Sequence, residues 1–210
     1  MIISFLNQKG GVGKSTLSYN VAFEISRRGK RVLFIDSDPQ GSASQISTSR
    51  EEPLHFPMVS IAHEGIGKEI KKFVDYYDVI VVDGIPELSK TTQATALVSN
   101  VIVVPMTVSG VDLRATGALI EMLNNVSVLN PDMVVGVVLN QYSENVNLTK
   151  DVLAALENTD WQVFDTRVAR RIAYAESGTY GLAVSEMPKD KGKKATQEVE
   201  SLVNEILELE

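Results

Sequence analysis

Short apolar runs alternate along the chain with segments in which apolar residues recur every three or four positions. The apolar runs predict five strands, at Ile2–Leu6, Arg31–Ile35, Val79–Val82, Val101–Pro105 and Met133–Leu139. Several of these runs consist of consecutive Val and Ile residues, which is typical of parallel strands buried on both faces. The alternation therefore favours an α/β fold with a doubly wound, mostly parallel sheet flanked by helices.

Between and after the strands, six segments have the spacing of amphipathic helices. They are Ser15–Arg28, Ile66–Phe73, Thr91–Val98, Leu113–Val126, Leu148–Glu157 and Ala195–Leu209. The last segment has one apolar face, as expected for a helix that covers a core. The less regular stretch Gln40–Pro57 predicts a short helix followed by a loop.

The composition is that of a globular protein, and we expect one domain over residues 1–210. The chain contains no cysteine and two histidines, which excludes thiolate metal sites and a thiol nucleophile and argues against Ser-His-Asp catalysis. A net charge of −7 argues against a uniformly basic nucleic-acid-binding protein but allows a local basic patch. With no signal peptide or run of about 18 apolar residues visible, we expect a cytoplasmic protein.

The strongest motif lies between the first predicted strand and the first predicted helix. It reads Lys9-Gly10-Gly11-Val12-Gly13-Lys14-Ser15-Thr16. Glycines let backbone N–H groups face phosphates, and the helix N-terminus adds its dipole. In such a loop Lys14 contacts the β- and γ-phosphates of a nucleotide and the Ser15 hydroxyl binds Mg²⁺. The usual pattern has glycine where this chain has Gln8, so the loop is a variant with an additional lysine, Lys9.

This loop resembles the deviant Walker A motif of the ParA/MinD superfamily of ATPases. Ile35–Gly41 is similar to the family's second motif and Val79–Pro86 to its Walker B strand, so the resemblance extends over nearly the whole chain. The short length is most similar to the ParF-like partition proteins. The resemblance implies a P-loop NTPase fold, ATP and Mg²⁺ as ligands, and slow, partner-stimulated hydrolysis. It also implies a role in partition of plasmid or chromosomal DNA, or in positioning a protein cargo on the nucleoid.

Three acidic residues follow predicted strands, at the sheet edge where open α/β folds bind ligands. Asp83 is expected to hold Mg²⁺ through water, and Asp36 to support the water shell of the metal. Asp38 resembles the family residue that orients the attacking water. Alternatively, Asp36 and Asp38 only form a helix cap and a turn.

Further residues carry roles that the resemblance implies. Lys9 matches the family's signature lysine, which reaches the partner's nucleotide across a two-fold interface and so implies an ATP-dependent homodimer; otherwise Lys9 is a solvated side chain. Asn140 resembles the Asn that hydrogen-bonds adenine in relatives, although Asn also commonly begins loops. Met187 and Pro188 lie where relatives wrap backbone around the base.

The segment from Thr166 to Lys194 is basic, with seven Lys or Arg residues and three acidic ones. Its first part, with Arg167, Arg170 and Arg171, resembles the family segment that holds nonspecific DNA through phosphate contacts. The alternatives are a solvated helix face, or a pairing of Arg171 with Glu176 or another acid. The chain carries five acidic residues and no Lys or Arg after Lys194, which anionic lipid would repel, so we expect no membrane attachment.

The expected partners are a second copy of the chain, nonspecific DNA and a small centromere-binding or cargo-adaptor protein. Two alternatives remain at this point. One is an ATP-dependent biosynthetic or metal-insertion enzyme of the same superfamily, although the absence of cysteine disfavours metal carriers. The other is a switch protein that binds nucleotide and recruits partners without hydrolysis.

Overall fold

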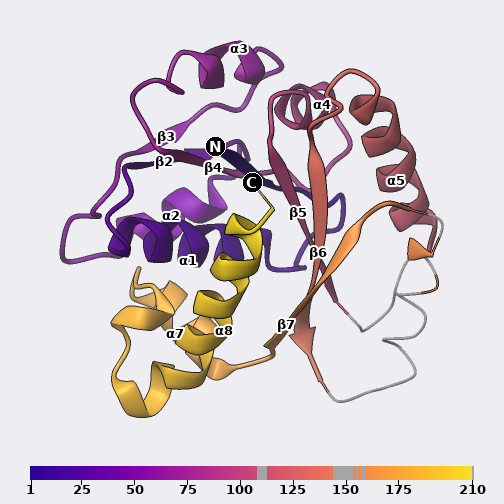
Figure 1. Ribbon diagram of the computed structural model, residues 1–210. Coiled ribbons are helices and arrows are strands. Elements are labelled where there is room, and N and C mark those ends of the chain that lie inside the picture. Colours follow the sequence, from indigo (N-terminus) through magenta and orange to yellow (C-terminus); the bar gives the residue numbers. More distant parts are fainter. Residues whose placement is uncertain (108–112, 144–153, 155, 158, 210) are drawn as a thin grey trace.

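A computed structural model describes residues 1–107, 113–143, 154, 156–157 and 159–209 of the chain. Within this part the centre is a sheet of seven strands in the order β3-β2-β4-β1-β5-β6-β7, and Figure 1 shows the sheet with its surrounding helices. Every neighbouring pair is parallel. The strands are β1 (Ile2–Phe5), β2 (Val32–Asp36), β3 (Met58–Ser60), β4 (Val79–Asp83), β5 (Val101–Thr107), β6 (Val134–Tyr142) and β7 (Gln162–Ala169).

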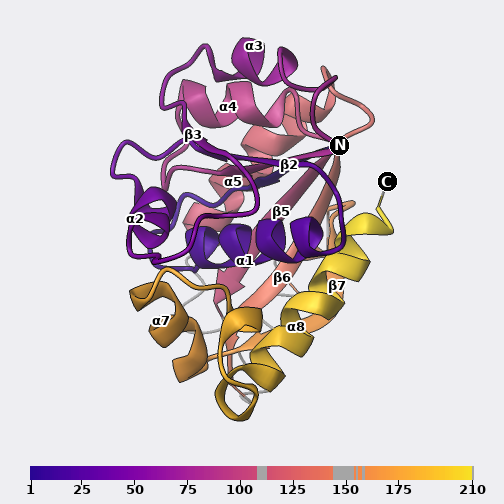
Figure 2. The same cartoon turned by 90° about the vertical axis from the view of Figure 1, so that its left-hand side faces the viewer.

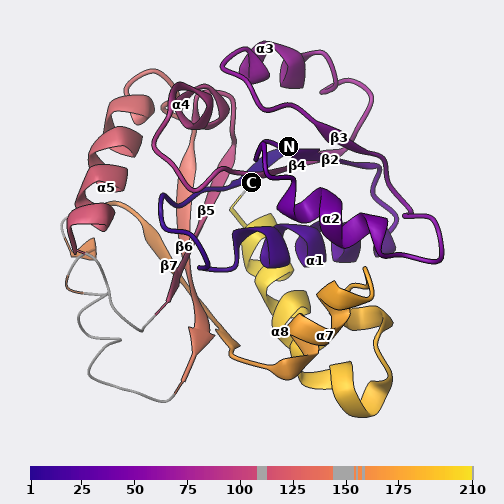
Figure 3. The same ribbon diagram turned by 180° about the vertical axis from the view of Figure 1, so that it is seen from behind.

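Helices cover both faces of the sheet, which confirms the predicted doubly wound architecture (Figures 1 and 3). The helices are α1 (Lys14–Arg27), α2 (Ser42–Thr48), α3 (Ile66–Lys71), α4 (Lys90–Ala96), α5 (Leu113–Ser127), α7 (Ile172–Thr179) and α8 (Lys189–Leu207), with a 3₁₀ turn η1 (Val184–Glu186). The first and last of these, α1 and α8, pack together on one face, while α3, α4 and α5 cover the other. Figure 2 shows α7 beside α8. No helix in the described part is long and apolar enough to cross a bilayer.

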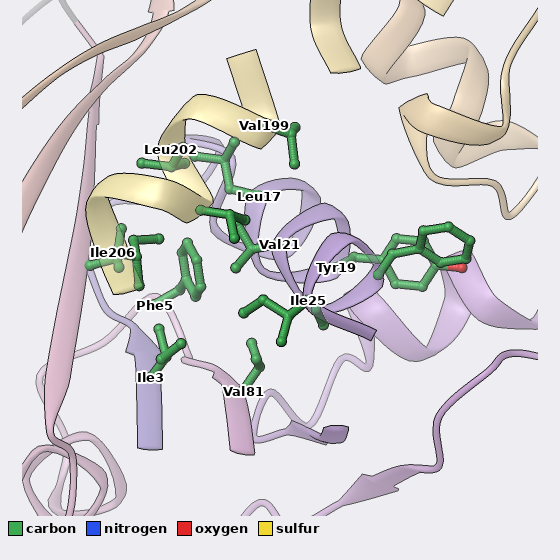
Figure 4. Packing of buried hydrophobic residues seen from close by; sticks show 14 of the residues in the cluster. Ile3, Phe5, Leu17, Tyr19, Val21, Ile25, Val81, Val199, Leu202 and Ile206 are labelled. Atoms are coloured by element: carbon green, nitrogen blue, oxygen red, sulfur yellow. The ribbon is translucent and has the colours of Figure 1, made fainter. Parts of the chain in front are cut away.

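The larger hydrophobic core lies between the sheet and the α1–α8 layer, as Figure 4 shows. Leu17, Val21 and Ile25 recur every four residues along α1, so one face of this helix meets the sheet. Ile3 and Phe5 of β1 lie opposite them and are fully buried. Each such side chain stabilises the fold by about 1.5–3 kcal/mol through its removal from water.

The five predicted strands are present, and two more strands, β3 and β7, complete the sheet. The short β3 has three residues, and β7 is an edge strand whose buried Phe164 and Val168 alternate with polar positions. Neither β3 nor β7 contains a continuous apolar run of strand length, so the sequence pattern did not predict them.

The predicted helices match α1, α3, α4, α5 and α8, and α2 with its loop matches the expectation for Gln40–Pro57. The last helix begins at Lys189 instead of Ala195 because its polar first turns pack Gly192 closely against Val184 and Met187. The additional α7 was not predicted. The predicted helix Leu148–Glu157 lies mostly outside the described residues.

Candidate functional site

The loop between β1 and α1 lies at the carboxyl edge of the sheet and forms one wall of a cavity of about 300 Å³. Gly11 and Gly13 have positive φ angles of 73° and 89°, a conformation that favours glycine. Helix α1 begins directly after them at Lys14. The cavity is lined by Gly10, Gly11, Gly13, Lys14, Ser15, Thr16, Asp38, Ser42, Pro86 and Gln141. A glycine-rich turn at a helix N-terminus is a ready site for an anion.

Lys14 supplies a buried positive charge at this cavity. Its side chain is 6% exposed, and its Nζ donates a hydrogen bond of 3.3 Å to the carbonyl of Lys9. Burial lowers the pKa of Lys14 from its ordinary value of 10.5, whereas the carboxylates of Asp83 and Asp38 act in the opposite direction. The side chain is therefore held inside the loop, beside two acidic groups.

Asp36 and Asp83 are neighbours at the ends of β2 and β4, where the register pairs them directly. Both are completely buried. Asp36 accepts hydrogen bonds from the backbone of Asp38 and from the backbone and hydroxyl of Ser44. This carboxylate therefore holds the turn before α2, although the N-cap of that helix is Gly41 and has no side-chain hydrogen bond; the role of Asp36 beside the metal stays a prediction.

Asp83 is different, because neither of its carboxylate oxygens has a hydrogen-bond partner within the described part of the chain. Burial raises its pKa to about 7, and the charge of Asp36 adds to this effect, while the nearby hydroxyls of Ser15 and Ser18 and the charge of Lys14 oppose it. An unpaired buried carboxylate costs free energy unless a cation or donor compensates it. Beside a phosphate-binding loop, the donor set fits Mg²⁺, which binds one or two carboxylates together with phosphate oxygens and water. No cluster of three or more metal-ligating His, Cys, Asp or Glu side chains occurs among the residues described, so the protein alone offers few ligands.

The pKa of Asp83 predicts a pH-dependent stability. Between its ordinary value of 3.8 and about 7, the folded chain binds more protons at this group than the unfolded chain does. The free energy of unfolding therefore falls as pH rises through this window, by up to about 4 kcal/mol from Asp83. We expect Asp83→Asn to gain stability relative to the parent chain from pH 4 to 7, with no further gain above pH 7, in urea unfolding with a chelator present. A difference that stays constant over that range would contradict the account of Asp83.

Asp38 lines the cavity from the turn before α2 and is 9% exposed. One of its carboxylate oxygens accepts a hydrogen bond from the backbone of Gln40. The residue thus forms the turn that the sequence offered as an alternative, and it also faces the phosphate loop. Lys9 is half-buried, and its backbone donates to Asn7. It does not line the cavity beside Lys14.

A second cavity, of about 270 Å³, adjoins the first, since the two share Gly13, Thr16 and Gln141. Asn140 lies in its wall and is buried, and its Nδ2 donates a 2.7 Å hydrogen bond to the carbonyl of Val12. The remaining lining comes from α1, the end of β7 and the start of α7: Leu17, Ala169, Arg170, Arg171, Tyr174 and Ala175.

Met187 and Pro188 are not brought to either cavity. Met187 is buried against Gly192 of α8. The preceding Glu186 forms a salt bridge of 2.7 Å with the buried side chain of Arg50, at the end of α2. The predicted contact of Met187 and Pro188 with adenine stays a prediction, and the two cavities do not include these residues.

The three arginines of the basic segment have different surroundings. Arg170 is exposed and lines the second cavity. Arg171 forms a salt bridge with Glu198 of α8, which raises the pKa of Arg171. Arg167 donates to the carbonyl of Phe164. The predicted alternative in which Arg171 pairs with an acid is therefore realised, with Glu198 as its partner, while Glu176 pairs with Lys191.

Three polar residues that line these cavities were not predicted from the sequence: Ser42, Gln141 and Tyr174. Ser42 follows Asp38 by four residues, so the spacing of the turn is a signal that points to it. No local signal marks Gln141 or Tyr174, because each lies far from the loop in the sequence.

Known proteins resemble this chain in both sequence and fold. The family model of the CobQ/CobB/MinD/ParA nucleotide-binding domain matches residues 3–184. The chain is 28% identical over 208 residues to maintenance of carboxysome distribution protein A of Halothiobacillus neapolitanus, covering 98% of this chain and 95% of that protein. It is 27% identical to the chromosome-partitioning ATPase Soj of Thermus thermophilus, with 88% and 87% covered. An ATP complex of McdA from Cyanothece has the same fold, with a TM-score of 0.81, 15% identity and coverage of 100% and 96%.

Proposed function

Because the chain belongs to the CobQ/CobB/MinD/ParA family of nucleotide-binding domains, we propose that it is a ParA-type ATPase that partitions DNA or positions a protein cargo on the nucleoid. The observation that carries this proposal is the phosphate loop with Lys14 buried beside the unpaired carboxylate of Asp83. Two relatives that match most of the chain are named for carboxysome distribution and chromosome partitioning. These names favour transport or positioning over the biosynthetic alternative.

The chemistry of the site follows from the placement of its charges. The N–H groups of the loop and the ammonium of Lys14 would bind the β- and γ-phosphates of ATP and stabilise charge that develops on them. Ser15 and Asp83 would hold Mg²⁺, which neutralises phosphate charge when bound. Asp38, which lines the same cavity, would orient the attacking water. Its carboxylate is fixed by the turn that it forms with Gln40.

We further propose that two ATP-bound chains form a two-fold dimer in which each Lys9 serves the other site. Symmetry makes the contribution reciprocal, because the same patch of each chain meets its copy. The support is the resemblance of the loop to the deviant Walker A motif, together with the position of Lys9 at the loop's start.

Lys9→Ala is expected to bind ATP as a single chain but to lose the ATP-dependent dimer. The bond from the backbone of Lys9 to Asn7 does not involve the side chain, so this contact remains in the variant. Light scattering with ATP and Mg²⁺ measures the mass of each protein, and ADP provides the monomer reference. A variant that reaches the dimer mass at the same concentration as the parent chain would refute the role of Lys9.

We propose that the chain binds nonspecific DNA. The residue proposed to contact the DNA is Arg170, at the end of β7. It is exposed, whereas Arg171 is paired with Glu198. Exposed lysines near the start of α8, at Lys189, Lys193 and Lys194, would extend the positive surface. A small adaptor protein on the cargo would stimulate hydrolysis and release the chain from DNA.

Arg170→Glu is expected to weaken DNA binding by about tenfold or more and to lower the salt dependence, since each lost phosphate contact removes roughly 0.9 from the log–log slope. Lys30→Glu is the matched control, because Lys30 is exposed and precedes β2, at the amino ends of the strands, whereas Arg170 follows β7 at their carboxyl ends. Fluorescence anisotropy with a DNA duplex at several salt concentrations measures both the affinity and its salt dependence for each variant. Equal loss of affinity in the two variants would show a general charge effect and contradict a local contact.

A further inference from the structure

Gln141 has an unusual backbone at the end of β6. Its φ of 52° makes it the one described non-glycine residue with a positive φ, in the left-handed region that long side chains rarely adopt. The pairing with β7 is also irregular here, since Asn140 opposes Val168 while Tyr142 opposes the next residue, Ala169. Gln141 is therefore the extra residue of a β-bulge. Bulges redirect side chains and occur often beside functional sites.

The bulge lets two consecutive side chains contact the same loop. Successive residues of a regular strand point to opposite faces, yet Asn140 and Gln141 both donate to the phosphate loop. The Nδ2 of Asn140 lies 2.7 Å from the carbonyl oxygen of Val12, and the Nε2 of Gln141 lies 2.8 Å from that of Gly11. The two amides thus hold adjacent carbonyls of one loop.

These two hydrogen bonds fix the orientation of the Gly11–Val12 and Val12–Gly13 peptide groups. In a trans peptide the carbonyl and the following N–H point in opposite directions. With the carbonyl of Gly11 bound by Gln141, the N–H of Val12 is directed away from Gln141. With the carbonyl of Val12 bound by Asn140, the N–H of Gly13 is likewise directed away from Asn140. A loop whose carbonyls turned inward would instead repel a phosphate.

We propose that Gln141, acting with Asn140, is a positioning residue that fixes the peptide orientation of the phosphate loop before nucleotide binds. This inference rests on the proposed function for the identity of the ligand, but the orientation itself is a property of the free protein. Gln141 is exposed and lines both cavities, so the residue lies where the two meet. A strained backbone retained at this position points to a role beyond stability.

The test uses Gln141→Gly, which relieves the left-handed backbone and removes the amide, and Gln141→Asn, which tolerates that backbone but has a shorter side chain. Gln45→Ala is the matched control, because the Nε2 of Gln45 also donates a 2.8 Å bond to a backbone carbonyl, that of Gln40. The measurements are melting temperature, the NMR chemical shifts of the Val12 and Gly13 amides without nucleotide, and the Kd for ADP with Mg²⁺.

Both Gln141 variants should keep or raise the melting temperature, shift the amide signals of Val12 and Gly13, and bind ADP roughly fivefold more weakly, as expected for one lost hydrogen bond. Gln45→Ala should leave these signals and the Kd unchanged. Signals and a Kd equal to those of the parent chain would overturn the inference, as would a lower melting temperature with an unchanged Kd. Shifted signals in a variant whose parent chain binds no nucleotide would support the positioning role and refute the ATPase proposal.

Discussion

Lys14→Ala is expected to abolish ATP hydrolysis and to raise the Kd for ATP by roughly 30-fold or more. The physical reason is the loss of a charge-assisted contact to the β- and γ-phosphates, which is worth about 2 kcal/mol or more in a partly buried site. The buried ammonium is positioned by the carbonyl of Lys9 and by the charges of Asp83 and Asp38, and Ala cannot replace it. Titration calorimetry and phosphate release measure the two effects.

Lys30→Ala is the control for this experiment, because it removes an exposed lysine that lies at the other edge of the sheet. It should bind and hydrolyse ATP as the parent chain does. Lys14→Ala should remain folded, since burial already disfavours the charged lysine, and a thermal melt checks this. Unchanged affinity and turnover in a folded Lys14→Ala protein would refute the assignment of the phosphate loop.

Asp38→Ala has the second large effect: hydrolysis should fall by about 100-fold or more while ATP binding is preserved. Orientation of water by a positioned carboxylate typically contributes factors of this size, and Asp38 is proposed to contact water and not the phosphates. Because Asp38 also accepts a hydrogen bond from Gln40, its removal should cost about 1 kcal/mol of stability.

Asp38→Asn separates these two roles of Asp38. The Asn side chain can keep the bond from Gln40 but carries no charge, so it should retain the parent's stability and still lose hydrolysis. Single-turnover phosphate release together with ATP titration gives both quantities. Normal hydrolysis by Asp38→Asn would show that the carboxylate serves only the turn.

The central part of the fold could be predicted because its signals are local. Runs of Val and Ile define the buried strands, and the glycine-rich segment before α1 defines the phosphate loop, so both can be identified from a few adjacent residues. The edge strand β7 was missed because Asp165, Thr166 and Arg167 interrupt its apolar positions. An edge strand buries few side chains, here Phe164 and Val168. Two apolar residues are too few to predict a strand from the sequence.

The arrangement of the site depended on contacts that no local pattern shows. Gln141 reaches Gly11 across 130 positions of sequence, and it does so only because a bulge turns its side chain. Arg171 was predicted to bind DNA, yet it pairs with Glu198, 27 positions away, once α8 packs beside α7. Residue types and spacing indicated the chemistry of the loop, whereas the partners of individual side chains required the packed structure.

The most direct test of the ATPase proposal is phosphate release from ATP by the purified chain, measured with Mg²⁺, with a chelator, and with Mg²⁺ plus duplex DNA and the cargo adaptor. We predict slow release with Mg²⁺, none with the chelator, and faster release when DNA and the cargo adaptor are both added. A folded chain that releases no phosphate under any of these conditions would contradict the proposal.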